Sequence, residues 1–173
     1  MIYVDKSRFG FNILIIFVFL FTIVVLGINS SLSIDEANSP SWDVSFGSVE
    51  VVNSKAYDIV NPKVNEKSTS INGGSFVLKS SDDSISYKIN VINKGSVDAK
   101  ITQFVIPEPN CSNLNCEGLE YDLIYDDGSL VKRGDILKSN EGKNIYLRFR
   151  YNGNISEPIS VNDVKLYIDY KER

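Results

Sequence analysis

Hydrophobic and polar positions divide the chain into two parts with different patterns. The first part is a nearly continuous apolar run from Phe9 to Ile28, interrupted only by Asn12, Thr22 and glycines. From Ser39 onward apolar residues instead alternate with polar ones, which is the period of a β-strand with one buried face. The pattern therefore predicts one membrane-inserting segment followed by a domain built from strands.

The apolar run has the length of a membrane span. Roughly 20 residues at 1.5 Å each match the hydrocarbon thickness of a bilayer. Lys6 and Arg8 precede the run, and the next basic residue is Lys55, so the positive-inside rule sends the C-terminal part outward. We predict a cytoplasmic N-terminus (1–8), a transmembrane helix or uncleaved signal-anchor (9–28), a tether (29–41) and an extracellular domain (42–173). This arrangement makes the chain a single-pass protein of the cell membrane.

Other interpretations of the apolar run remain open. A cleaved signal peptide has a shorter apolar core and a small-x-small cleavage site, for which "SLS" at 31–33 is a passable match, and cleavage there would give a secreted protein. The stretch "GFNILIIFVF" resembles the start of type IV prepilins, although Ile15 stands where that family carries a glutamate. A helix buried in a protein core fits less well, because the run has no polar face.

Seven segments after the run have the alternation of strands. The expected inward-facing residues are Trp42, Val44 and Phe46 in 42–52, Ile85, Tyr87, Ile89 and Val91 in 84–93, Leu119, Tyr121, Leu123 and Tyr125 in 119–125, Ile145, Leu147, Phe149 and Tyr151 in 143–151, and Val164, Leu166, Ile168 and Tyr170 in 163–171. Segments 75–79 and 97–106 supply two more strands. Gly47 allows a change of phase, as at a β-bulge.

Turn residues separate these segments. Asn, Asp and Gly cluster at 72–74 ("NGG"), 80–83 ("SSDD"), 93–95 ("NKG"), 126–128 ("DDG"), 140–142 ("NEG") and 152–154 ("NGN"). Short strands with such punctuation, and no amphipathic helix, predict an all-β fold, an antiparallel β-sandwich of the Ig-like or jelly-roll kind. Residues 53–73 are expected to form a long connection with room for one edge strand.

Two outward-facing rows suggest a paired surface. Lys165, Tyr167, Asp169 and Lys171 in the last strand complement Tyr146, Arg148 and Arg150 in the strand before it. Cross-strand pairing on a solvated face is the simpler interpretation. A patch for a ligand or polysaccharide is the functional alternative.

Composition narrows the possible chemistry. The net charge is −4 and no basic cluster occurs, which argues against nucleic acid as a partner. The chain has no histidine, so Ser–His–Asp and Cys–His catalytic sites are impossible, and we find no phosphate-binding glycine loop. We therefore expect no enzymatic activity, no catalytic residues and no cofactor.

The two cysteines and the paired aspartates are the remaining candidates. Outside the cytoplasm Cys111 and Cys116 are expected to form a disulfide, because they lie close together in a polar loop and lack the C-x-x-C spacing of a redox pair. With only two cysteines and no histidine, a zinc site with four Cys and His ligands is excluded. "SSDD" and "YDDGS" do not match a calcium-loop motif and are expected to be turns, while a calcium site shared by two adjacent loops stays open.

Several stretches together resemble a known family. "SYKINVINKGSVDAKI" (86–101), "YDLIYDDGSLVKRGDILKSNEGKNIYLRFRY" (121–151) and "WDVSFGSVEV" (42–51) resemble exported surface proteins of the TasA/camelysin type. The resemblance implies a jelly-roll-like sandwich on the cell surface or in a matrix, which assembles into fibres by strand donation and carries no catalytic residue. Residues 34–46 would be the free N-terminal arm if the apolar run were removed.

These observations give two functional expectations. The first is a membrane-anchored protein with a non-catalytic structural, adhesive or assembly role at the cell surface. The alternative is a secreted fibre subunit of the TasA/camelysin type. The expected partners are the membrane and another protein chain, or a second copy, that pairs with an edge strand.

Overall fold

A computed structural model describes residues 41–65, 68–112, 116, 118–153 and 157–173. The predicted cytoplasmic N-terminus, transmembrane helix and nearly all of the tether lie outside the described residues. Pro40–Arg173 forms one compact unit. Over its described part this unit is all-β, and it contains no helix that could cross a bilayer.

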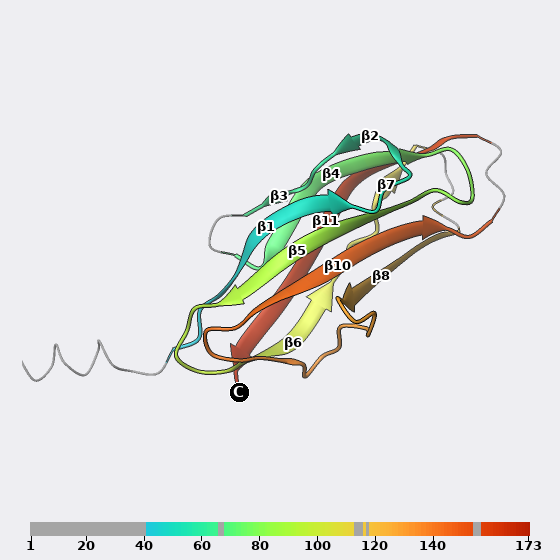
Figure 1. The fold of residues 1–173 in the computed structure, drawn as a ribbon. Coiled ribbons are helices and arrows are strands. Elements are labelled where there is room, and N and C mark those ends of the chain that lie inside the picture. Colours follow the sequence, from blue (N-terminus) through green and yellow to red (C-terminus); the bar gives the residue numbers. More distant parts are fainter. Residues whose placement is uncertain (1–40, 66–67, 113–115, 117, 154–156) are drawn as a thin grey trace, which may run out of the picture. The chain divides into compact units, whose positions relative to one another are not determined.

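Two antiparallel sheets face each other (Figure 1). One sheet has the order β1-β5-β10-β8, formed by Val44–Val52, Ser84–Asn93, Gly142–Tyr151 and Leu119–Tyr125. The other has the order β2-β4-β11-β6-β9, formed by Tyr57–Val60, Ser70–Leu78, Ile159–Glu172, Ala99–Val105 and Ile136–Leu137. Two short strands complete it, with β3 (Lys63–Val64) on β4 and β7 (Asn110–Cys111) on β11.

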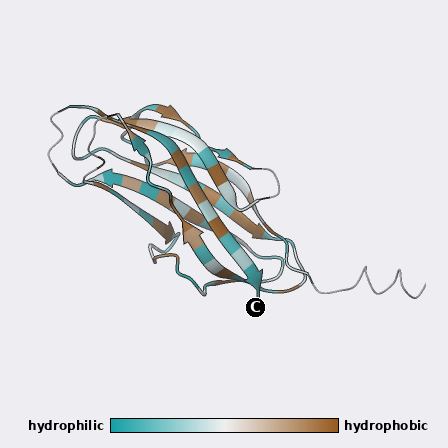
Figure 2. Cartoon of the chain, turned by 180° about the vertical axis from the view of Figure 1, so that it is seen from behind, coloured by the Kyte–Doolittle hydropathy of each residue, from teal (hydrophilic) through white to brown (hydrophobic). Residues whose placement is uncertain are grey.

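Alternating side chains place the core between the two sheets. In β5, for example, Ile85, Tyr87, Ile89 and Val91 are all buried, and the residues between them are only partly buried. The same alternation runs along β10 and β11, where it is visible as bands of hydropathy (Figure 2). Phe76 of β4 meets Phe149 of β10 across the core, with ring centroids 5.3 Å apart. The all-β, antiparallel and sandwich-like features expected from the sequence are thus confirmed.

Two expectations for β1 have different outcomes. The register against β5 shifts between Phe46 and Ser48, so the phase change expected at Gly47 is confirmed. Trp42, expected to point inward with Val44 and Phe46, is instead 42% exposed. The reason is that the chain enters the sheet only at Val44. The carbonyl groups of Ser41 and Asp43 accept hydrogen bonds from the turn after β5, Asp43 from Lys94 at 2.8 Å.

The described part of residues 53–73 contains more strand structure than expected. These residues contain β2 and β3, which both pair with β4, and "NGG" lies inside β4 instead of forming a turn. The register of β11 against β4 shifts on both sides of the Val164–Gly74 pair. A Cβ on Gly74 would come within 3.1 Å of the Val164 side chain and 3.0 Å of Pro62. The absence of a side chain at Gly74 therefore serves close packing within a strand, not a turn.

The two outward-facing rows do not pair with each other, because β10 and β11 belong to different sheets. The arginines of β10 instead pair with acids of β8. Arg148 Nη2 lies 2.6 Å from an Asp122 carboxylate oxygen, and Arg150 Nε lies 2.8 Å from one of Glu120. The expectation that the β10 arginines form cross-strand pairs is thus confirmed, but the expected partner strand was wrong, because the partners lie on β8 and not on β11.

Candidate interaction surface

The flank of the sandwich between β6 and β8 carries incompletely paired strand edges. β8 is the last strand of its sheet, and β9 covers only the Ala99 and Lys100 end of β6. In the part of the chain that the structure describes, no strand lies beside residues 102–105 of β6 on that side. We call this region the β6–β8 flank, defined by residues 102–106, 119–123 and 130–132. Unpaired strand edges of this kind are templates for pairing with another chain.

The connection from β8 to β9 covers part of the flank. The Tyr125 N–H donates to the Ser129 carbonyl at 2.8 Å, and the Val131 N–H donates to the Leu123 carbonyl at 2.9 Å. Ile124 and Leu130 form an isolated antiparallel bridge between them. This connection therefore covers the edge of β8 at Leu123–Tyr125, and it does not cover the part of the edge that begins at Leu119.

An apolar groove of about 400 Å³ lies on the flank. Its lining residues, which come from both sheets and the connection between β8 and β9, are Phe104, Ile106, Tyr121, Asp122, Leu123, Leu130, Val131 and Lys132. Tyr121 and Leu130 stay 38% and 55% exposed, although both are large and apolar. A groove that combines apolar lining with unpaired backbone is suited to an extended peptide segment, which pairs through its main chain and buries alternate side chains.

The alternation of apolar and polar residues did not predict this surface. Tyr121 is on the row expected to face inward, and its ring does lie 5.7 Å from that of Phe149, but its other side is open. The signal that could have located the groove is the apolar run Phe104–Val105–Ile106, where alternation stops just before Pro107. Only knowledge of the strand order shows that this run stands opposite β8.

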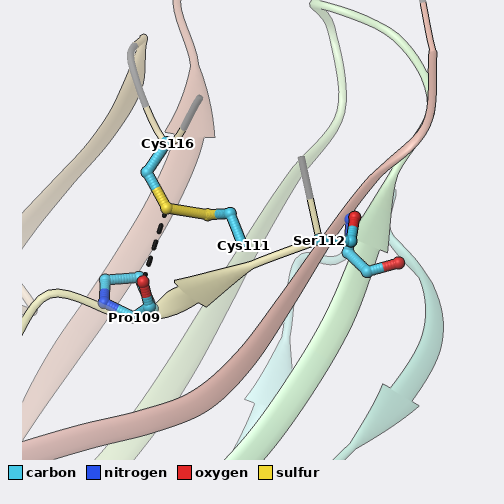
Figure 3. The surroundings of a disulfide bond; sticks show 5 residues. Pro109, Cys111, Ser112 and Cys116 are labelled. Atoms are coloured by element: carbon cyan, nitrogen blue, oxygen red, sulfur yellow. Dashed lines mark hydrogen bonds between the residues drawn. A yellow bond between two sulfur atoms is a disulfide. The ribbon is translucent and has the colours of Figure 1, made fainter. Parts of the chain in front are cut away.

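The two cysteines lie at disulfide distance next to the crossing from β6 to β8. Cys111 belongs to β7, which pairs with β11 in one sheet, and Cys116 lies just before β8 of the other sheet. Figure 3 shows the bond beside β7, with the Cys116 sulfur 3.4 Å from the Pro109 carbonyl oxygen. The bond closes a loop with a sequence separation of five residues. It therefore joins β7 of one sheet to the position just before β8 of the other.

The structure separates the two aspartate pairs that could have shared a calcium ion. Asp83 directly precedes Ser84, the first residue of β5. Asp126 instead contacts Asn144 of β10, and Asn144 pairs with Asn90 near the other end of β5. Among the described residues no group of three or more acidic or cysteine side chains is placed to hold a metal ion. The two loops are therefore not the adjacent pair that such a site requires.

One aspartate of each pair accepts hydrogen bonds within its own turn. The Asp83 carboxylate accepts hydrogen bonds from the N–H of Lys79 at 2.7 Å and of Ser80 at 3.0 Å. Asp127 likewise caps its turn through the N–H and hydroxyl of Ser129, and these bonds hold the pKa of its carboxyl below the usual value. Both "SSDD" and "YDDGS" are thus turns, as expected.

A second, polar hollow of about 460 Å³ lies beside the turn after β8. Its acidic side chains are already engaged: Tyr125 donates to Asp135 at 2.9 Å, and Tyr146 donates to Asp126. The Lys143 ammonium group donates to the Ile136 carbonyl at 3.0 Å. These groups stabilise the hairpin around the hollow.

Charges on the outer face of the β1-β5-β10-β8 sheet are also paired with one another. Hydrogen bonds from Asn152 and Arg150 lower the pKa of the Glu120 carboxyl, and Lys88 lies 3.2 Å from Glu50. These contacts agree with the simpler interpretation of this face, in which charged side chains pair across strands on a solvated surface. The β6–β8 flank, in contrast, combines incompletely paired strand edges with an apolar groove.

Comparison of the chain with protein-family models, with curated proteins and with solved structures finds no match. The functional argument therefore depends on the geometry of the chain itself.

Proposed function

We propose that the chain is a membrane-anchored protein whose sandwich lies outside the cell and has a non-catalytic structural or adhesive role through assembly with other chains. The observation that carries this proposal is the β6–β8 flank, with its open strand edges beside an apolar groove. The apolar run at 9–28 supports the anchor, and the positive-inside rule supports the outward orientation. For the type of β-sandwich, we propose an Ig-like or jelly-roll topology.

The proposed occupant of the flank is an extended segment from a second copy of the chain. Its main chain would add a strand to β8 or β6, and alternate apolar side chains would fill the groove between Phe104 and Tyr121. Such an interaction needs no catalytic group.

A mutational comparison tests this assembly. Tyr121→Lys with Leu130→Lys places charges in the groove, whereas Tyr57→Lys with Val60→Lys does so at exposed positions of β2. We expect the flank variant of the full chain to lose chemical cross-linking between copies by about tenfold, as for a central hot spot, and the β2 variant to keep it. Circular dichroism shows whether both variants fold. Equal cross-linking in two folded variants would contradict the proposed role of the flank.

The anchor has a separate test. Mass measurement of the mature protein from cell membranes should find residues 1–33 retained, and protease added to intact cells should remove the sandwich. A mature chain that begins near Ile34 would instead favour release.

The alternative is a secreted fibre subunit of the TasA/camelysin type, and the same groove favours it because strand donation needs an acceptor. The free arm cannot extend over all of 34–46, however, because Val44 and Phe46 already pair with β5. The Ser41 carbonyl also accepts a hydrogen bond from the Ser96 N–H at 2.8 Å. Only residues before Ser41 would be available as a donor. Electron microscopy of purified mature protein tests this alternative, which requires filaments.

A further inference from the structure

Three segments meet at the end of the sandwich where the chain enters β1. They are residues 41–43, the turn 93–98 after β5 and the turn 137–141 before β10, which we call the entry tip. The Lys94 N–H donates to the Asp43 carbonyl at 2.8 Å, and the Ser139 hydroxyl donates to the Gly95 carbonyl at 2.8 Å. The Arg173 N–H also reaches the Asp98 carbonyl at 3.1 Å. The entry and the C-terminal end of the described chain thus lie together.

A buried amide fixes the entry tip. Asn93 is fully buried, and its Oδ1 accepts hydrogen bonds from the N–H groups of Gly95 at 3.0 Å and Asp43 at 3.3 Å. Its Nδ2 lies within donating distance of three carbonyls, those of Val97 at 2.9 Å, Lys138 at 3.1 Å and Leu137 at 3.3 Å. One side chain therefore joins all three segments, and the tip is a preformed surface.

Trp42 stands exposed on this tip. The position of a Cβ on Gly95 lies 2.5 Å from the Trp42 Cα, so the tryptophan backbone lies directly on the turn that carries Lys94. Its indole is the only one in the chain, and tryptophan is enriched where an apolar surface meets water at a bilayer.

Charges at the tip favour an anionic surface. Among the described residues neither Lys94 nor Lys138 has an ion-pair partner. The nearby acids are mostly engaged: Glu141 lies 3.6 Å from Lys143, and Asp98 lies 3.6 Å from Arg173. Asp43 is the remaining acid. An exposed aromatic ring on the same tip as two lysines without ion-pair partners matches the boundary between lipid headgroups and acyl chains.

The tether keeps this surface near the membrane. Residues 29–41 separate the predicted span from Trp42, and thirteen residues extend to at most about 45 Å. We propose that the entry tip docks on the bilayer itself, with Trp42 at the headgroup level and Lys94 and Lys138 on anionic lipid phosphates. This inference rests on the proposed membrane anchor. Docking of the entry tip would fix the orientation of the sandwich on the membrane, because the opposite end of β5 would point away from the lipid.

The single tryptophan allows a direct test. The full chain is reconstituted in vesicles of phosphatidylcholine with a minority of phosphatidylglycerol, with or without lipids brominated near the headgroup. Flotation on a density gradient first measures whether the chain is bound to vesicles. We expect bromolipid to quench the Trp42 emission by about twofold or more, because the indole lies at the interface.

A matched control moves the probe to the far end of the sandwich. Trp42→Phe with Tyr57→Trp places the only indole at a 46%-exposed position of β2. Its emission should be insensitive to bromolipid and accessible to aqueous acrylamide. Lys94→Gln with Lys138→Gln should reduce quenching of Trp42 to the level measured in vesicles without phosphatidylglycerol.

The outcomes separate this inference from the anchor. A chain that floats, with Trp42 unquenched and open to acrylamide, overturns the docked tip and leaves the anchor intact. A chain that floats, with Trp42 shielded from both quenchers, also overturns it and assigns the tip to a protein contact. A chain that does not float contradicts the anchor and the inference together.

Discussion

Tyr87 and Phe149 pack edge to face in the core, with ring centroids 6.3 Å apart, and the hydroxyl of Tyr87 has no hydrogen-bond partner in the described structure. Burial also raises the pKa of this phenol, so the group stays protonated. An unpaired buried hydroxyl costs free energy that phenylalanine would not cost.

We therefore expect Tyr87→Phe to raise the free energy of unfolding by about 1 kcal/mol. Tyr125→Phe is the matched control, because its hydroxyl donates to Asp135 at 2.9 Å, and it should lower stability by about the same amount. Urea unfolding followed by fluorescence measures both. A clear loss of stability in Tyr87→Phe would mean that the hydroxyl has a partner.

Gly95 is the position where the entry tip tolerates no side chain. A Cβ there would lie 2.3 Å from the Ser41 carbonyl oxygen, whereas one on Gly142 would meet nothing closer than 3.8 Å. Gly95→Ala should therefore lower the free energy of unfolding by about 1–3 kcal/mol, and Gly142→Ala should change it by less than about 0.5 kcal/mol. If thermal unfolding shows equal effects for the two variants, the close approach of residues 41–43 to the turn is wrong.

The disulfide should stabilise the fold modestly, because the loop between Cys111 and Cys116 is short. Replacing both cysteines by serine is expected to lower stability by about 2 kcal/mol. Reductant should weaken the original protein by a similar amount and leave the serine variant unchanged. A reductant effect on the serine variant would show that the loss has another cause.

Asp83 should contribute to acid unfolding. Burial raises the pKa of its carboxyl, but hydrogen bonds from the Lys79 N–H and from Ser80 outweigh burial, so the pKa in the folded state lies below the reference value of 3.8. A group with a lowered folded-state pKa stabilises the fold above its unfolded pKa, and this stability is lost as the pH falls through the folded value.

Asp83→Asn should therefore flatten the fall in stability between about pH 5 and pH 2. Asp82→Asn is the matched control, because it removes one charge from the same turn without touching those hydrogen bonds. Urea unfolding across this pH range measures the slopes. Parallel slopes for Asp83→Asn and the original protein would contradict the capping role.

Local alternation predicts the middle of the sheets well because burial of one face depends on the sequence of each strand alone. β5 buries all four residues expected from its period, and β10 and β11 bury all but the last of theirs, because Tyr151 and Tyr170 are only partly buried. Sheet membership depends instead on pairing between distant segments. For this reason the partner of Arg148, the strand position of Gly74 and the open side of Tyr121 could not be predicted from the sequence.

The candidate surface depends on the same long-range information. The run at 104–106 is a local signal, but it lines a groove only because β8 ends its sheet on the same flank where β9 covers only one end of β6. The entry tip similarly needs the contact between Trp42 and Gly95, which are far apart along the chain.

Amide hydrogen exchange on the full chain in vesicles, measured at increasing protein density, tests assembly through the β6–β8 flank most directly. We predict that residues 102–105 and 119–122 gain protection as the density rises, while β2 at the other edge of the second sheet does not. Unchanged exchange along both flank edges at densities where copies associate would contradict the account.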